Sequence, residues 1–169
     1  MSTHLIVGPT GSGKTRHLRQ LIAEAATDPA TTTWAIDPRG ELTTADRRAT
    51  LDDAEQMLAL ALAVVDQRTT APHNTRQHAH QPTADEPRIR LLIDEAEHLL
   101  RRETTAEQLY TLVTTGRPAA IETVIAVNDL RLSTWPLDLR DHYLAGTVTQ
   151  LQDIRIVPAH QVLADATQD

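Results

Sequence analysis

The sequence predicts an α/β fold, with a mostly parallel sheet flanked by helices on both faces. Three observations support this prediction. Short apolar runs, typical of buried strands, alternate with segments whose apolar residues recur at helical spacing. A glycine-rich loop, residues 8–15, separates the first apolar run from the first helical segment. An acidic pair, Asp94-Glu95, directly follows a later apolar run. Strands that alternate with helices in this way form a parallel sheet joined by crossover helices.

Each element is predicted from its local pattern. The expected strands cover residues 5–7, 33–36, 89–93, 121–127, 143–148 and 154–157. Helices are expected from the glycine-rich loop to about Ala26, from a capping pattern at Thr50-x-x-Asp53 through Val65, and from Thr104 to a stop at Gly116. Residues 69–87 contain three prolines and no periodicity, which predicts a flexible loop. No internal boundary appears, so residues 1–169 are expected to form a single domain.

Composition narrows the classes of function. The formal net charge is −7, from 16 basic and 23 acidic residues, which argues against a surface that broadly binds nucleic acid. A few arginines gathered along one channel stay compatible with that charge. The chain has no cysteine, in keeping with a cytoplasmic protein. Its longest apolar run, Met57 to Val65, is nine residues long, so no membrane segment is expected.

The segment Gly8-Pro9-Thr10-Gly11-Ser12-Gly13-Lys14-Thr15 fits the pattern G-x-x-x-x-G-K-[ST] at every fixed position. Glycines let the backbone curl around an anion with its N–H groups pointing inward, and the following helix adds the positive end of its dipole. Lys14, the only lysine in the chain, would reach the β- and γ-phosphates. All eight residues are therefore predicted to bind a nucleoside triphosphate, taken to be ATP.

The acidic pair is the expected second half of that site. Asp94 follows the apolar run 89–93 and would share Mg²⁺ with the hydroxyl of Thr15. Glu95 would polarise the attacking water, which predicts a hydrolase. Two acids after a strand are also a common helix start; their pairing with the phosphate loop favours the catalytic interpretation. The predicted fold class is thus a P-loop NTPase of the RecA/ASCE-like type, and the predicted activity is that of an ATPase.

Asn128 ends the strand 121–127, which is expected to lie beside the Asp94 strand or next to the phosphate loop. Its amide would hydrogen-bond the γ-phosphate or the water. The alternative, equally supported by the sequence, is that Asn128-Asp129 begins a turn. Asp37 and Arg39 are expected to shape the end of the second strand, and Trp34 and Trp135 to pack in the core and against a loop.

Several segments together resemble the FtsK/SpoIIIE family of hexameric DNA translocases, within the HerA/FtsK group of P-loop ATPases. Besides the phosphate loop, Ile36-Asp37-Pro38-Arg39-Gly40 is similar to the family's I-D-P-K-G segment, and 91–97 resembles its V-I-V-D-E segment. Gly116-Arg117 and Asp138-Leu139-Arg140 are similar to further family elements. The chain departs from the family at 127–130, where Val-Asn-Asp-Leu replaces T-Q-R-P.

The resemblance implies a motor core without the family's ring-forming and winged-helix domains. It implies ATP bound between subunits of a homo-oligomeric ring such as a hexamer, and double-stranded DNA as the partner, in plasmid, phage or conjugative transfer. It also implies an arginine from a neighbouring subunit, for which Arg117 and Arg140 are the candidates. Arg101-Arg102 would face DNA in the channel or lie on a helix surface.

Two other functions stay open on the sequence alone. One is a DNA-independent ATPase that acts with a protein partner as a regulatory or assembly factor, similar to Zot-type proteins. The other is a nucleotide-binding module with weak hydrolysis. A zinc site at His73, His78 and His80 is a weaker hypothesis, because their spacing matches no zinc motif.

Overall fold

The computed structural model describes residues 3–70, 79–131, 135 and 138–151. Within them, six strands form one sheet in which every pairing is parallel, in the order β3-β2-β4-β5-β1-β6. The strands are β1 Thr3–Val7, β2 Thr31–Ile36, β3 Arg47–Ala49, β4 Arg88–Ile93, β5 Ile121–Val127 and β6 Thr147–Gln150. The predicted α/β class is confirmed, and the sheet is parallel throughout its described strands.

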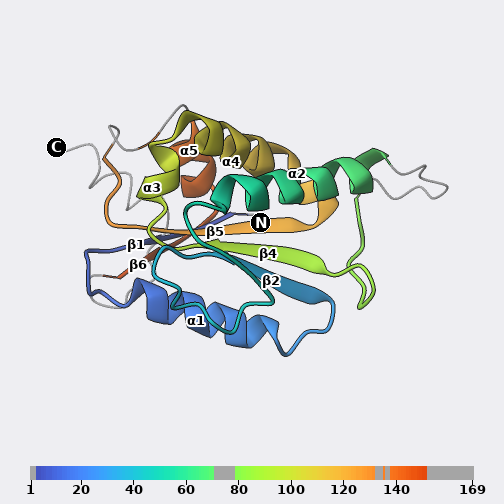
Figure 1. The fold of residues 1–169 in the computed structure, drawn as a ribbon, viewed down its shortest axis with the longest axis horizontal. Coiled ribbons are helices and arrows are strands. Elements are labelled where there is room, and N and C mark those ends of the chain that lie inside the picture. Colours follow the sequence, from blue (N-terminus) through green and yellow to red (C-terminus); the bar gives the residue numbers. More distant parts are fainter. Residues whose placement is uncertain (1–2, 71–78, 132–134, 136–137, 152–169) are drawn as a thin grey trace.

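Helices cover both faces of this sheet (Figure 1). One face carries α1, Lys14–Ala25. The other carries α2 Ala54–Thr70, α3 Glu97–Leu100, α4 Glu103–Thr115 and α5 Leu139–Leu144. A short 3-10 turn, Arg117–Ala119, precedes β5. Among the described helices, α1 is the one on its face, whereas α2 and α4 pack against each other on the opposite face.

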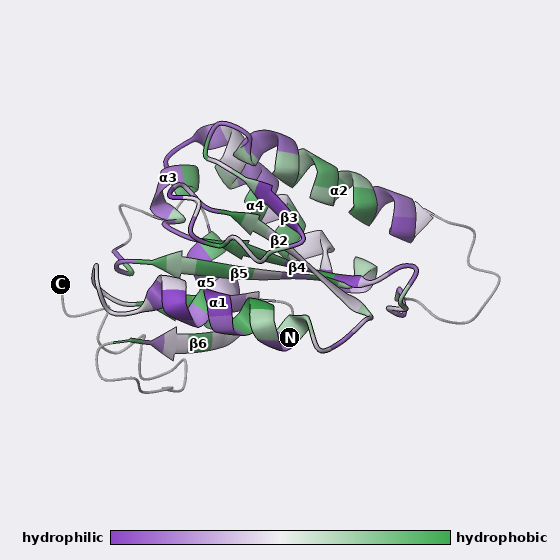
Figure 2. Ribbon diagram, turned by 60° about the horizontal axis from the view of Figure 1, so that its bottom comes forward, coloured by the Kyte–Doolittle hydropathy of each residue, from purple (hydrophilic) through white to green (hydrophobic). Residues whose placement is uncertain are grey.

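Two apolar cores follow from the alternation of side chains along each strand. On the α1 face, Leu18 and Ile22 pack with Ile6, Leu92 and Val124 of the sheet. On the other face, a larger core fills the space under α2, α4 and α5 and includes the buried Trp34 and Trp135, as expected for both tryptophans. Strands β4 and β5 contribute to both cores, and β5 is hydrophobic along most of its length (Figure 2).

The central position of β5 sets up the functional edge of the sheet. β5 pairs with β1 on one side, with Val7 opposite Val127, and with β4 on the other, with Ile93 opposite Ile125. In a parallel sheet all carboxyl ends meet at one edge, which is where ligands bind in open α/β sheets. The segments that follow β1, β4 and β5 therefore lie side by side there. The sequence expected β5 beside one of these strands, and it lies between them.

Several elements differ from the prediction; the short helix α3 and the 3-10 turn before β5, for example, were not expected. The segment 143–148, predicted as a strand, instead contains the end of α5 and the start of β6, because Tyr143 and Leu144 point their side chains into the core from a helical turn. β3 was not predicted; its three residues include two exposed arginines. α2 begins at Ala54 rather than near Thr50, whose hydroxyl donates to the Asp53 carboxylate. The strand expected at 154–157 lies outside the described residues.

The first two residues of the expected loop 69–87 belong to α2 instead, which continues to Thr70. Residues 71–78, with His73 and His78, lie outside the described part of the chain, and 79–87 contain neither helix nor strand. Among the described helices, none is long and apolar enough to cross a membrane.

Candidate nucleotide-binding site

The glycine-rich loop after β1 is shaped so that only glycine fits at three positions. A Cβ on Gly8 would lie 2.5 Å from Ser12 Oγ and 2.9 Å from the carbonyl oxygen of Leu151. Gly11 and Gly13 have φ values of 85° and 96°, in the left-handed region that favours glycine. Ser12 Oγ is buried and has no hydrogen-bond partner in the described structure. This cradle, with an unsatisfied hydroxyl, fits a phosphate group.

Lys14 begins α1 and is buried, with 8% of its surface exposed. Its Nζ donates to the carbonyl oxygens of Gly8 and Pro9, at 2.6 and 3.1 Å, and to Asn128 Oδ1 at 2.9 Å. Burial lowers the pKa of Lys14, and the nearby carboxylates of Glu97 and Asp94 partly oppose that shift. The lysine is thus held at the mouth of the loop by protein oxygens.

Thr15 and Asp94 meet at the base of the loop. Thr15 Oγ1 donates to Asp94 Oδ2 at 2.5 Å, although 79 positions separate the two residues in the chain. Asp94 lies at the end of β4 and is 4% exposed; burial raises its pKa, and the Thr15 hydroxyl opposes this. A hydroxyl and a carboxylate in contact beside a phosphate cradle are ligands suited to Mg²⁺, so the residues present fit that ion.

Glu95 is held in an unusual backbone conformation by the turn after β4. Its φ is 49°, and its N–H donates to the carboxylate of Asp94 at 3.0 Å. Its own carboxylate pairs with Arg39 at 2.6 Å and lies 3.6 Å from His98 Nε2. The sequence had assigned Arg39 to shaping the end of β2; the pairing with Glu95 was missed. Asp37 does shape that end, since it accepts the N–H groups of Arg39 and Leu42 at 2.9 and 2.7 Å.

The tip of β5 connects the two halves of the site. The Gly8 N–H donates to the Val127 carbonyl, and the Ala96 N–H to the Ala126 carbonyl. One residue further on, the Asn128 side chain accepts from Lys14, and the Asn128 N–H donates to the carboxylate of Glu97. Sequence reasoning missed Glu97. Its spacing could have indicated it, because Glu97 lies three residues after Asp94, about one helical turn.

The two candidate trans-acting arginines lie outside this group. Arg117 is exposed at the opposite edge of the sheet, before β5 begins, and lines a polar pocket with Arg88. Arg140 is largely covered in α5, with 15% of its side chain exposed, and its Nε lies 3.6 Å from Asp141. Arg102 donates to the Leu51 carbonyl at 3.1 Å, so it ties α4 to the start of α2. The structure therefore brings neither Arg117 nor Arg140 to the chain's own phosphate loop.

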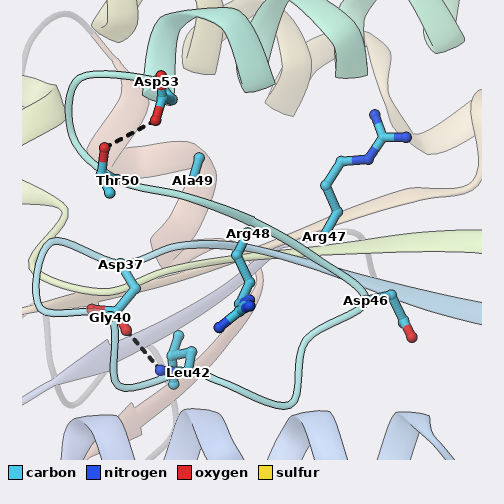
Figure 3. A pocket seen from close by; sticks show the side chains of 9 residues that line it. All are labelled: Asp37, Gly40, Leu42, Asp46, Arg47, Arg48, Ala49, Thr50 and Asp53. Carbon is cyan, nitrogen blue, oxygen red and sulfur yellow. Dashed lines mark hydrogen bonds between the residues drawn. The ribbon is translucent and has the colours of Figure 1, made fainter.

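Other polar groups do not add to the site. His80 Nε2 lies 3.0 Å from the Glu86 carbonyl, and within the described residues no cluster of three potential metal ligands occurs. A cavity of about 490 Å³ lies beside β3, and none of residues 8–15 lines it (Figure 3). It is lined by Asp37, Gly40, Leu42, Asp46, Arg47, Arg48, Ala49, Thr50 and Asp53.

A parallel sheet that places a glycine-rich loop, its lysine and a threonine–aspartate contact at one edge defines the chain as a P-loop NTPase. The model of the AAA domain family matches residues 2–129, and the chain belongs to that family. The match covers β1 through β5 and thus includes the phosphate loop, Asp94 and Asn128. No curated protein matches the sequence significantly.

Solved structures share the fold at low sequence identity. EssC from Geobacillus thermodenitrificans (ATPases 2 and 3) has a TM-score of 0.74 and 16% identity over 95% of this chain and 34% of that chain. EccC from Thermomonospora curvata (ATPases 2 and 3), in complex with a signal sequence peptide, has a TM-score of 0.61 and 18% identity over 75% of this chain and 25% of that chain. The chain thus spans about a quarter to a third of these relatives. The genome packaging NTPase of Sulfolobus turreted icosahedral virus 2, in complex with AMPPCP, has a TM-score of 0.57 and 11% identity, over 98% of this chain and 81% of that chain.

Proposed function

We propose that this chain binds and hydrolyses Mg-ATP and is the motor core of an FtsK/SpoIIIE-type DNA translocase. The observation that carries the hydrolytic part is the contact between Thr15 and Asp94, whose chain neighbours are Lys14 and Glu95. A phosphate cradle, a cation ligand pair and a carboxylate next to that pair are the parts that phosphoryl transfer to water requires.

Each residue has a distinct role in this proposal. The N–H groups of the loop after Pro9, residues 10–15, and the ammonium of Lys14 bind and orient the ATP phosphates. Thr15 and Asp94 hold Mg²⁺, which when bound neutralises phosphate charge. Glu95 accepts a proton from the attacking water, and its pairing with Arg39 orients its carboxylate. The Asn128 side chain, whose Oδ1 contacts Lys14, lies within the same group; its Oδ1 would accept from the water, or its Nδ2 would donate to the γ-phosphate.

Double-stranded DNA is the partner favoured by the resemblance of the I-D-P-R-G segment to the translocase family. Arg39 of that segment contacts Glu95, so the segment reaches the proposed hydrolytic site. Because the net charge is −7, DNA contact must come from a restricted set of arginines rather than from the whole surface. We infer a homo-oligomeric ring in which Arg117, which is exposed, serves the neighbouring subunit's site.

A protein partner in place of DNA is the second candidate. It is favoured by the acidic surface charge and by the shared fold with EccC, a type VII secretion ATPase whose structure holds a signal sequence peptide. In this case hydrolysis would respond to a polypeptide and not to nucleic acid.

Steady-state ATP hydrolysis with and without duplex DNA tests the proposal and separates the candidates. We expect wild-type turnover that rises with duplex DNA, none above background in Lys14→Ala, and ATP binding without turnover in Glu95→Gln. Loss of one catalytic carboxylate should lower the rate by about 10²–10⁴-fold. ATP hydrolysis at the same rate with and without duplex DNA would favour the protein partner over DNA. Normal turnover in Glu95→Gln would contradict the assignment of the base.

A further inference from the structure

The geometry points to Glu97 as a positioning residue that acts through Asn128: its carboxylate fixes the tip of β5 so that the Asn128 amide holds Lys14. This inference rests on the proposed ATP site and adds a residue that neither the family pattern nor the sequence assigned. It concerns one chain of contacts, from Glu97 to Asn128 to Lys14.

The first step is the anchoring of Glu97 itself. Glu97 is the first residue of α3, and the preceding residue, Ala96, is buried and donates its N–H to the Ala126 carbonyl at 3.0 Å. The turn after β4 is thereby attached to β5 directly beside Glu97. Its carboxylate then accepts the N–H of Asn128, the first residue after β5. Two consecutive contacts thus lock the turn to the strand tip.

The second step is what this lock does to Asn128. Asn128 is exposed and follows the last residue of β5, so the strand pairing alone does not orient it. With its N–H held by Glu97, its side chain accepts from Lys14 Nζ at 2.9 Å. Lys14 has two other acceptors, the Gly8 and Pro9 carbonyls, which belong to its own loop. Asn128 is therefore the one described acceptor that ties Lys14 to a different element.

The consequence for catalysis is a prepositioned amide. When Lys14 binds the ATP phosphates, the Asn128 side chain loses its hydrogen bond with Lys14. The Asn128 backbone N–H stays bound to the Glu97 carboxylate. The amide then remains beside the reacting groups and need not be ordered during the reaction, which is the benefit of preorganisation. Without the Glu97 carboxylate, the Asn128 N–H loses its acceptor, and the Asn128 side chain is no longer held next to Lys14.

The single lysine gives a test that does not depend on turnover. Because Lys14 is the only lysine, labelling of the nucleotide-free protein with an amine-reactive acetylating reagent, followed by peptide mass spectrometry, reports on Lys14 apart from the α-amino group. We expect Asn128→Ala and Glu97→Ala to speed this labelling by about tenfold, the scale of one hydrogen bond to a charged group. Glu97→Gln keeps the acceptor oxygen but removes a charge that favours protonated Lys14, so it should label faster than wild type and clearly more slowly than Glu97→Ala. Labelling of Glu97→Gln as fast as Glu97→Ala would overturn the inference in favour of a charge effect.

Turnover supplies the second readout. Glu97→Ala should lower kcat by about tenfold with little change in the Kd for ATP, and the double variant Glu97→Ala/Asn128→Ala should be no slower than Asn128→Ala alone. Multiplied effects in the double variant would show that Glu97 does not act through Asn128. Glu107→Ala, an exposed glutamate on α4, is the matched control, and a thermal melt of each variant identifies any that fail to fold. If wild type itself does not hydrolyse ATP, the proposed function fails, and the labelling result still decides the role of Glu97.

Discussion

His4 and His17 face each other across the β1–α1 contact, with ring centroids 5.9 Å apart. His4 Nε2 lies 2.9 Å from Thr149 Oγ1, and His17 Nε2 is buried with no partner in the described structure. Burial, reinforced by the charge that His17 would carry, lowers the pKa of His4 to about 4. A single residue just upstream of the phosphate loop thus makes the fold sensitive to acid.

The sign of this sensitivity follows from the direction of the shift. Folding favours neutral His4, so the stabilisation is fully present above about pH 6.5 and is lost as the pH falls towards 4. After allowance for partial exposure, we expect about 1–3 kcal/mol of unfolding free energy to be lost in that window. Urea unfolding between pH 8 and pH 4.5 should show this loss in wild type and a smaller one in His4→Gln. The exposed His142→Gln is the control, and equal pH slopes in all three proteins would contradict the assignment.

At the scale of elements, the sequence predicted well wherever apolar periodicity and a loop motif agreed. β1, α1 and β4 carry both signals, and they hold the phosphate loop and the acidic pair. β3 carried no such signal, since its three residues include two exposed arginines, one of which lies 4.6 Å over the Trp34 ring. The 143–148 error has the same origin: a short apolar run does not distinguish a strand from a helical turn.

The residues of the site were likewise predicted where a local motif marked them. The roles predicted for Lys14, Thr15 and Asp94 depend on motifs local to each segment, and the structure places these residues together. The contacts of Glu95 with Arg39, and of Glu97 with Asn128, join segments that are distant in the chain. Such pairings depend on which strand ends become neighbours, and local sequence patterns carry no information about that.

Arg68 shows how one side chain anchors a whole helix. From the last turn of α2 it donates to the Ala119 and Pro87 carbonyls, both at 2.8 Å, and so ties α2 to the segments that precede β5 and β4. Arg68→Gln should lower the free energy of unfolding by about 1–3 kcal/mol, because two carbonyls lose a charged donor. The free energy of unfolding of Arg68→Lys should lie between those of wild type and Arg68→Gln, because an ammonium lacks the planar array of donors that lets a guanidinium reach both carbonyls. Urea unfolding measures both, with the exposed neighbour Gln67→Ala as control; no difference between Arg68→Gln and that control would rule out the anchor.

At the scale of the whole molecule, the two edges of the sheet differ in chemistry. The carboxyl edge carries the phosphate loop, Asp94 and Asn128, whereas the amino edge carries Arg88 and Arg117, both exposed and without an ion pair in the described structure. In a ring built by head-to-tail contacts, unlike surfaces of successive subunits meet. This asymmetry is what an arginine acting on a neighbour's ATP would require, and it favours Arg117 over the largely covered Arg140.

Mixed oligomers test this arrangement directly. Lys14→Ala lacks a functional phosphate loop but keeps Arg117, and Arg117→Ala has the opposite defect. Each alone should be inactive, because a trans-acting arginine contributes on the order of 10³-fold in rate. An equimolar mixture should recover about a quarter of wild-type ATP hydrolysis, the share of subunit contacts that pair an intact loop with an intact arginine in a head-to-tail ring. The same mixture made with Arg140→Ala compares the second candidate. Activity that equals the sum of the separate variants in both mixtures would show that neither arginine acts between subunits.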